Sequence, residues 1–320
     1  MKQTNSLNDL VEMNINNSDQ WVLVRGKNIN APLLIHVQAG PGLPMISEAN
    51  EMEKHLHLEE KFLVAYWDQR GCGKSFNKHI PTETITLTQM ADDIIACTKY
   101  LLKKYNKSKA IVVGYSIGAT TGLMAAVRDS SIFSVLFAAG TDVDIPYANH
   151  YALDFAMDKA TAWKNNKLIK KINELKSRPI TESIRFQQRA VILSNLGGIN
   201  ADSNYNSLVL GAVKNMLFSK YYGLGGLIKT MKGMEFCQNA LIPEMNGLNL
   251  FQNVTKLSVP VHFIQGNLDA IAPVEKGKEY YEQLQAPDKS FTLFEKSAHM
   301  PQYEEPEKFS KLILSFSGLA

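Results

Sequence analysis

One serine of the chain stands in a context that would make it a nucleophile. Ser116 is the centre of the pattern Gly-x-Ser-x-Gly over residues 114–118, which follows the apolar run 110–113 and precedes small residues typical of a helix. At a sharp strand-to-helix turn, flanking glycines let the backbone pack tightly while the serine hydroxyl projects outward. A plain structural turn is the alternative. The position between a strand and a helix favours a nucleophile that attacks a carbonyl carbon.

A serine hydroxyl is a poor nucleophile until a base takes its proton, and histidine titrates in the useful range. The chain has seven histidines. His36 and His262 lie within apolar, strand-like runs, which favours a role in the core. His299 lies in a loop after the last predicted strand and before the final predicted helix. Because parallel sheets build their sites on such loops, we predict His299 as the general base.

The third residue must accept a hydrogen bond from the imidazole and hold its tautomer. Asp269 follows the predicted strand 261–265, and the order Ser116, Asp269, His299 is a known order for a triad on a parallel sheet. Asp142 and Asp144, after the predicted strand 134–139, are the rivals. A helix cap is the other reading of Asp269. We predict Asp269 as the acid.

Acyl transfer also needs backbone N–H donors for the negatively charged oxygen of the tetrahedral intermediate. The residue after the nucleophile, Ile117, supplies one of them. The second is expected from the turn 38–42, which follows the predicted strand 33–37 and contains two glycines that allow close backbone approach. Gly40 is the predicted donor, and Ala39 stays open as its neighbour.

The elements that would position these residues alternate along the chain. Short apolar runs typical of strands alternate with helical patterns, which predicts an α/β fold with a mostly parallel sheet flanked by helices. The predicted strands are 21–25, 33–37, 62–67, 110–115, 134–139, 261–265 and 291–294, and the main helices are 86–105, 116–128, 274–284 and 306–316.

The alternation stops between residues 142 and 255. Helical patterns cover 147–176, 181–196 and 207–220 without a convincing strand, and the glycine run 223–226 is expected to break a helix, with turns at Pro243 and Gly247. We therefore predict a catalytic domain made of residues 1–141 and 255–320. Residues 142–254 are expected to form a helical cap inserted into it.

Composition excludes several other classes of protein. The chain has 320 residues and a formal net charge of +3, which is too small to suggest nucleic-acid binding. Its three cysteines form no Cys-x-x-Cys pair and no metal-finger spacing, so buried free thiols in a reducing compartment are expected. The polar N-terminus lacks the apolar core of a signal peptide, and no run of 18 apolar residues occurs. We predict a cytoplasmic protein without a membrane partner.

These residues together resemble the proline iminopeptidase (prolyl aminopeptidase) family of the α/β-hydrolase superfamily. The sequence QAGPG at 38–42 looks like the oxyanion turn HGGPG of that family, and DQRGCGKS at 68–75 looks like its signature DQRG-x-G-x-S. Ser116, Asp269 and His299 fall in the family's order. The resemblance covers about two thirds of the chain and implies the α/β-hydrolase fold with a serine triad.

The resemblance also implies an activity: the release of an N-terminal residue from short peptides through an acyl-enzyme, without a metal or organic cofactor. Gln38, Ala39 and Ile117 depart from the family, which has His and Gly in the oxyanion turn and often Trp after the nucleophile. The family binds the substrate amine with acidic cap residues, and the cap here offers Glu182, Glu235 and Glu244 without a matching context.

Two other functions stay open. The first is a carboxylesterase or another hydrolase of small esters and amides, because the same triad serves both kinds of substrate. The second is a non-catalytic binding protein that kept the fold. The expected partner is in every case a small molecule or short peptide. The sequence predicts no oligomeric state.

Overall fold

The computed structural model describes residues 5–317. Within them, eight strands form one sheet in the order β1-β2-β4-β3-β5-β6-β7-β8. Their bounds are β1 Leu7–Ile15, β2 Ser18–Gly26, β3 Leu33–Val37, β4 Leu63–Asp68, β5 Ala110–Tyr115, β6 Phe133–Ala139, β7 Val261–Gly266 and β8 Lys289–Phe294. The pairs β1–β2 and β2–β4 are antiparallel, and the other neighbours are parallel. The predicted mostly parallel sheet is confirmed.

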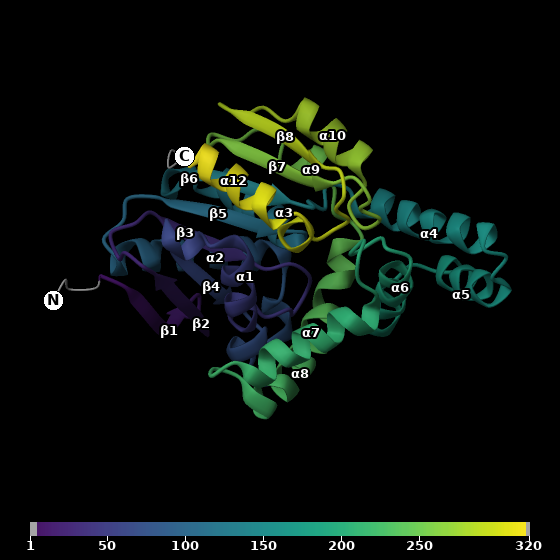
Figure 1. Cartoon of the computed structure of the whole chain (residues 1–320), viewed down its shortest axis with the longest axis horizontal. Helices are drawn as coiled ribbons and strands as arrows, with labels where there is room; N and C mark the ends of the chain where they lie inside the picture. The colour runs from purple at the N-terminus through teal and green to yellow at the C-terminus, as the bar shows by residue number, and fades with distance from the viewer. Residues whose placement is uncertain (1–4, 318–320) are drawn as a thin grey trace.

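Helices cover both faces of the sheet, so its central strands are buried on each side (Figure 1). One face packs against α2 (Leu87–Lys104), α3 (Ile117–Arg128) and α10 (Val274–Gln283). The other packs against α1 (Ala49–Leu56) and α12 (Pro306–Phe316). Burial on two faces explains why these strands are nearly continuous apolar runs in the sequence.

The first strand was not predicted, because residues 7–15 were interpreted as part of a polar N-terminal segment. In β1 the side chains of Val11, Met13 and Ile15 are buried and alternate with exposed polar residues. This period of two is the pattern of a strand with one solvent-exposed face. The turn to β2 is Asn16-Asn17, both with positive φ (48° and 59°), as a two-residue hairpin requires.

Between β6 and β7 the described chain is helical. The helices are α4 Ile145–Ala162, α5 Asn166–Lys176, α6 Ser183–Asn195, α7 Tyr205–Phe218, α8 Gly223–Met245 and α9 Leu250–Asn253. Figure 1 shows α4 to α6 projecting beyond one end of the sheet and α7 and α8 running along its side. A single antiparallel bridge between Asp144 and Asn249 joins the two ends of this segment where it leaves the sheet.

Three local predictions in this segment were wrong. The predicted helix 147–176 is two helices, because Lys164 takes a positive φ of 53° in the turn between them. The glycine run 223–226 opens α8 instead of breaking a helix. Pro243 lies inside α8, in its last turn, and the helix ends two residues later at Met245. Among residues 5–317, no helix has the length and apolar character needed to cross a bilayer.

Candidate active site

Ser116 lies at the sharp turn between β5 and α3. Its φ of 52° and ψ of −124° are strained for a residue with a side chain, as is typical of a nucleophile at such a turn. Gly118 must be a glycine, because a Cβ there would collide with the carbonyl oxygens of Val37 and Gln38. The missing side chain therefore lets the turn after β3 pack directly against the turn that holds Ser116.

This packing brings the predicted oxyanion donors to the nucleophile. Gly40 and Ile117 line the same cavity as Ser116. Gly40 has a positive φ of 62°, which is the conformation that favours glycine in this turn. Ile117 is the first residue of α3, where a backbone N–H has no partner inside the helix. Both positions are therefore suited to donate to an oxygen bound beside Ser116.

Asp269 and His299 are in direct contact. The Nδ1 atom of His299 lies 2.8 Å from Oδ2 of Asp269, which is fully buried. The other carboxylate oxygen, Oδ1, accepts the N–H groups of Ile271 and Ala272 at 2.8 and 2.9 Å. One oxygen thus shapes the loop after β7 and the other faces the imidazole. The bonds to Ile271 and Ala272 are those that a capping aspartate makes. The contact with the imidazole goes beyond such a cap.

Two further contacts fix the position of His299. Its ring lies against Gly140, where a Cβ would come within 3.0 Å of Nδ1. The backbone N–H of His299 donates to Ile199 O at 2.9 Å, and the backbone N–H of Ala270, next to Asp269, donates to Gly198 O at 3.0 Å. The segment 198–199 between α6 and α7 therefore holds both loops in place.

The environment of His299 raises its pKa. Burial lowers the pKa of the imidazole. This effect is outweighed by the negative charges of Asp269, Asp142 and Glu304 and by the hydrogen bond to Asp269. The protonated ring is thus favoured relative to a free histidine with a pKa of about 6.5. A ring with this environment is well suited to take a proton from a hydroxyl and to keep it during a reaction.

The hydroxyl of Ser116 donates to Asp142 and not to His299. The distance from Oγ to Asp142 Oδ2 is 3.0 Å. Asp142 is buried in the loop after β6, and burial raises the pKa of its carboxyl against the effects of His299 and Ser116. The rival acids thus have other roles than the imidazole contact: Asp142 contacts the serine, and Asp144 caps α4 by accepting from Tyr147 N.

The cavity beside Ser116 has a volume of about 40 Å³. Asn149 on α4, Arg189 on α6 and Asn246 after α8 are its polar residues from the inserted helices, together with apolar side chains such as Phe186. This is room for about three water-sized groups. The guanidinium of Arg189 donates through Nη1 to Asn149 Oδ1. Sequence reasoning missed Arg189, because only the packing of the helices shows that it is buried.

The three glutamates that were predicted to bind substrate lie elsewhere. Glu182 is exposed and pairs with Arg178 at 3.7 Å. Glu235 is exposed on α8, and Glu244 accepts the N–H of Leu87 at 2.9 Å, where α2 begins. None of them lines the cavity beside Ser116. The substrate-binding role predicted for them has no support in this arrangement, because their carboxylates face solvent or cap another helix.

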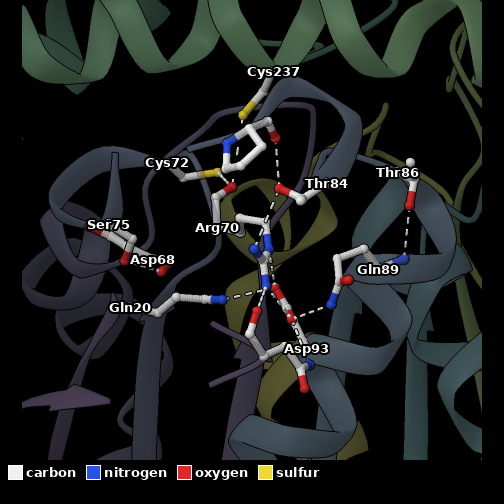
Figure 2. A network of polar contacts seen from close by, with 12 residues as sticks. Gln20, Asp68, Arg70, Cys72, Ser75, Thr84, Thr86, Gln89, Asp93 and Cys237 are labelled. Carbon is white, nitrogen blue, oxygen red and sulfur yellow. Dashed lines mark hydrogen bonds and ion pairs between the residues drawn. The ribbon is translucent and has the colours of Figure 1, made fainter. Parts of the chain in front are cut away.

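The run 68–75 supports the site without entering it. Figure 2 shows the guanidinium of Arg70 facing Asp93 on α2, with Nε and Nη2 at 2.7 and 3.0 Å from the two carboxylate oxygens. Gln20 and Gln89 also donate to this carboxylate, each at 2.8 Å. The buried pair ties the loop after β4 to β2 and to α2.

Asp68, which begins this run, joins it to two other segments. Its carboxylate accepts the N–H groups of Met45, Ile46 and Lys74 at 2.8–2.9 Å and the hydroxyl of Tyr222, which precedes α8. The run therefore connects the turn region after β3 with the inserted helices.

Comparisons with known proteins agree with this architecture. A family model described as alpha/beta hydrolase fold matches residues 41–306. The chain is 29% identical to the probable aminopeptidase YbaC of Bacillus subtilis (strain 168), over 94% of each chain. Among solved structures, a proline iminopeptidase of Mycobacterium smegmatis is 17% identical with a TM-score of 0.60, covering 96% of this chain and 97% of that one.

An esterase from Exiguobacterium antarcticum has a similar fold. It is 17% identical with a TM-score of 0.58, and the match covers 97% of this chain and 99% of the esterase. At these identities the structural likeness concerns the fold alone, which hosts different hydrolases. The match to the family model extends over most of the chain, from the turn after β3 to the start of the last helix. The chain belongs to the alpha/beta hydrolase fold family.

Proposed function

We propose that this protein is a serine hydrolase that releases an N-terminal residue from short peptides through an acyl-enzyme. The observation that carries the proposal is the contact of His299 with Asp269 at the same edge of the sheet as the strained Ser116. Nucleophile, base and acid come from the loops after β5, β8 and β7. This is the expected arrangement of a serine triad on a parallel sheet.

The reaction begins with a rotation of the serine side chain. Ser116 Oγ leaves Asp142 and turns to His299 Nε2, a contact that often tightens only when substrate is bound. Oγ then attacks the carbonyl carbon while His299 takes the proton and Asp269 stabilises the imidazolium. Gly40 and Ile117 donate to the oxyanion. His299 gives its proton to the departing amine. In the second half of the reaction, His299 activates a water molecule, which hydrolyses the acyl-enzyme and releases the N-terminal residue as a free amino acid.

Asp142 provides the amine-binding group that an aminopeptidase needs. Once Ser116 turns to His299, the buried carboxylate of Asp142 loses its hydrogen-bond donor. The ammonium of an N-terminal residue is attached to the carbon next to the carbonyl that Ser116 attacks, so it comes within reach of this carboxylate. A simple ester has no cation to place there. This carboxylate favours the aminopeptidase over the carboxylesterase, as does the similarity to the probable aminopeptidase of Bacillus subtilis.

Two further points belong to the proposal. Residues 142–254 would act as the cap over a catalytic domain of residues 1–141 and 255–320, supported by the bridge between Asp144 and Asn249 where the two parts join. A cytoplasmic location is supported by the three cysteines, which are free and buried.

A substrate panel tests the proposal. We expect cleavage of alanine, leucine or proline p-nitroanilide, no cleavage of the N-acetylated anilides, and loss of activity in Ser116→Ala. Ser207→Ala, at an exposed serine on α7, is the matched control. Turnover of p-nitrophenyl acetate without any anilide cleavage would instead identify an esterase. Absence of fluorophosphonate labelling at Ser116 would favour a binding protein.

A further inference from the structure

Arg189 is a buried cation without a counterion in contact. It is 8% exposed and lines the cavity beside Ser116 and Asp142. Nη1 donates to Asn149, whereas the buried Nε has no acceptor. Among residues 5–317, no carboxylate comes within the 4 Å of an ion pair with this guanidinium. Within the described residues, the edge that carries Nε and Nη2 therefore makes no hydrogen bond.

The guanidinium is held in a fixed orientation. Asn149 donates through Nδ2 to Asn246 Oδ1 at 3.1 Å, and Asn246 donates to Ile180 O at 2.7 Å. The ring of Phe186 lies 5.0 Å from the guanidinium carbon of Arg189. A chain of hydrogen bonds across α4, α6 and the end of α8 thus orients the guanidinium before any ligand binds, whereas a surface arginine is free to change its rotamer.

The cavity wall holds a guanidinium and a carboxyl group that do not pair. Asp142 acts on Arg189 only from a distance, because its carboxylate contacts Ser116. Burial lowers the pKa of Arg189 to about 10, and Asp142 opposes this effect. Arg189 is charged at neutral pH, and the carboxyl of Asp142 belongs to the same cavity wall. A ligand complementary to this wall carries an ammonium near Asp142 and a carboxylate near Arg189.

We propose that Arg189 is a specificity-determining residue that binds a carboxylate of the substrate close to the bond that is cleaved. The unpartnered edge of the guanidinium, with Nε and Nη2, has the donors for two parallel N–H···O bonds to a carboxylate. This inference rests on the proposed function for the identity of the reaction. The carboxylate belongs either to the side chain of an acidic N-terminal residue or to the free C-terminus of a dipeptide, and the two sources are separated by experiment.

The first experiment measures kcat/KM for matched pairs of substrates. Glutamate and aspartate p-nitroanilides are compared with glutamine and asparagine p-nitroanilides, and Ala-Ala with its C-terminal amide. We expect the acid to exceed its amide by roughly 30-fold or more in one pair type, which identifies the source. Equal kcat/KM values for acid and amide in both types of pair would overturn the proposal. This test needs only the wild-type protein.

Variants assign the effect to this side chain. Arg189→Gln is expected to lower the acid-to-amide ratio of kcat/KM to about 1. Arg189→Lys is expected to restore only part of the ratio, since an ammonium cannot make two parallel bonds. Arg178→Gln, at an exposed cap arginine, is the control and leaves the ratio unchanged. A ratio that survives in Arg189→Gln would contradict the assignment.

A binding assay separates this inference from the proposed function. Acetate and glutarate are tested for protection of Ser116 against a fluorophosphonate, with acetamide and glutaramide as neutral controls. Protection by the acids that is lost in Arg189→Gln supports the carboxylate site even in a protein that cleaves no peptide. If peptides are cleaved without a preference for acids, and the acids do not protect Ser116 from labelling, the proposed aminopeptidase activity is retained and the carboxylate site at Arg189 is rejected.

Discussion

At the scale of single residues, the Ser116 hydroxyl has one acceptor in the resting protein and needs another in the reaction. It donates to Asp142 at 3.0 Å, while His299 is oriented by Asp269. If the imidazole is the base, Ser116→Ala and His299→Ala should each lower kcat by about 10⁴-fold or more, and Asp269→Asn should also be severe. Steady-state kinetics with an anilide substrate measures this. A His299→Ala protein within tenfold of wild type would contradict the triad.

The pH dependence of kcat/KM tests how the neighbouring carboxylates affect the pKa of His299. The base must be neutral, so activity falls as the pH drops through the pKa of His299, which its surroundings raise. We expect the acid limb of kcat/KM to lie above the 6.5 of a free histidine. In Asp142→Asn one of the charges that raise this pKa is gone, so the limb should move to lower pH.

The same variant tests amine binding. Asp142→Asn should lower kcat/KM for a free-amine anilide, because the neutral amide cannot compensate an ammonium, and should leave p-nitrophenyl acetate hydrolysis within a few-fold. The neighbouring Asp144→Asn, at a helix cap outside the cavity, is the control. Equal losses on both substrates would assign Asp142 to support of the serine and not to substrate binding.

The sequence predicted the residues of the site that lie next to strand ends. Ser116, Asp269 and His299 follow apolar runs, and parallel strands bring their carboxyl ends to one edge. It did not predict the contact of Asp142 with the serine, because side-chain orientation within a loop has no periodic signal. Arg189 was missed for a related reason: a residue on α6 reaches the cavity only through the packing of α4, α6 and α8.

At the scale of elements, the buried pair of Arg70 and Asp93 fastens β2 and the loop after β4 to α2. Its side chains are 3% and 1% exposed, and Asn16 and two glutamines also donate to the carboxylate. Removal of one partner leaves a buried charge uncompensated, so Asp93→Ala should lower the free energy of unfolding by about 3 kcal/mol or more. Urea unfolding measures the loss.

The adjacent residue offers a control for this prediction. Asp92, also on α2, pairs with Arg128 at 2.8 Å, but the two side chains are 36% and 47% exposed. Asp92→Ala should cost less than about 1 kcal/mol, as exposed ion pairs do. Similar losses in the two variants would contradict a supporting role specific to the Arg70–Asp93 pair.

The elements that were predicted best have strong periodic patterns. β3, β5 and α12 have the predicted bounds, because apolar runs and an amphipathic helix leave little choice. β1 was missed although its side chains alternate, since its polar residues dominate the composition of the segment. In the inserted helices the glycines and Pro243 were given too much weight, because neighbouring helices stabilise α8 against the local cost of these residues.

At the scale of the whole molecule, the inserted helices are attached to the sheet at several separate points. Asp144 and Asn249 bridge at the base, the segment 198–199 bonds to the loops of Asp269 and His299, and Tyr222 donates to the buried Asp68. The site is therefore shaped by contacts between the insertion and the sheet. Loosening one contact should loosen the insertion without unfolding the sheet.

Tyr222→Phe is the substitution that isolates one such contact. It keeps the ring and removes the hydroxyl that reaches Asp68, so the carboxylate keeps only its backbone donors on the loops after β3 and β4. We expect faster limited proteolysis near the start of α8, because the hydrogen bond that holds this segment to the sheet is lost. Mass spectrometry of the first fragments locates the cut.

Tyr221→Phe is the matched control, because its hydroxyl donates at the exposed surface to Asn8. It should leave the cleavage rate close to that of wild type. If both variants are cut equally fast, the bond to Asp68 does not hold the insertion. If Tyr222→Phe is cut faster and also raises KM more than it lowers kcat, then the same contact that fixes α8 also maintains the cavity wall that receives the substrate.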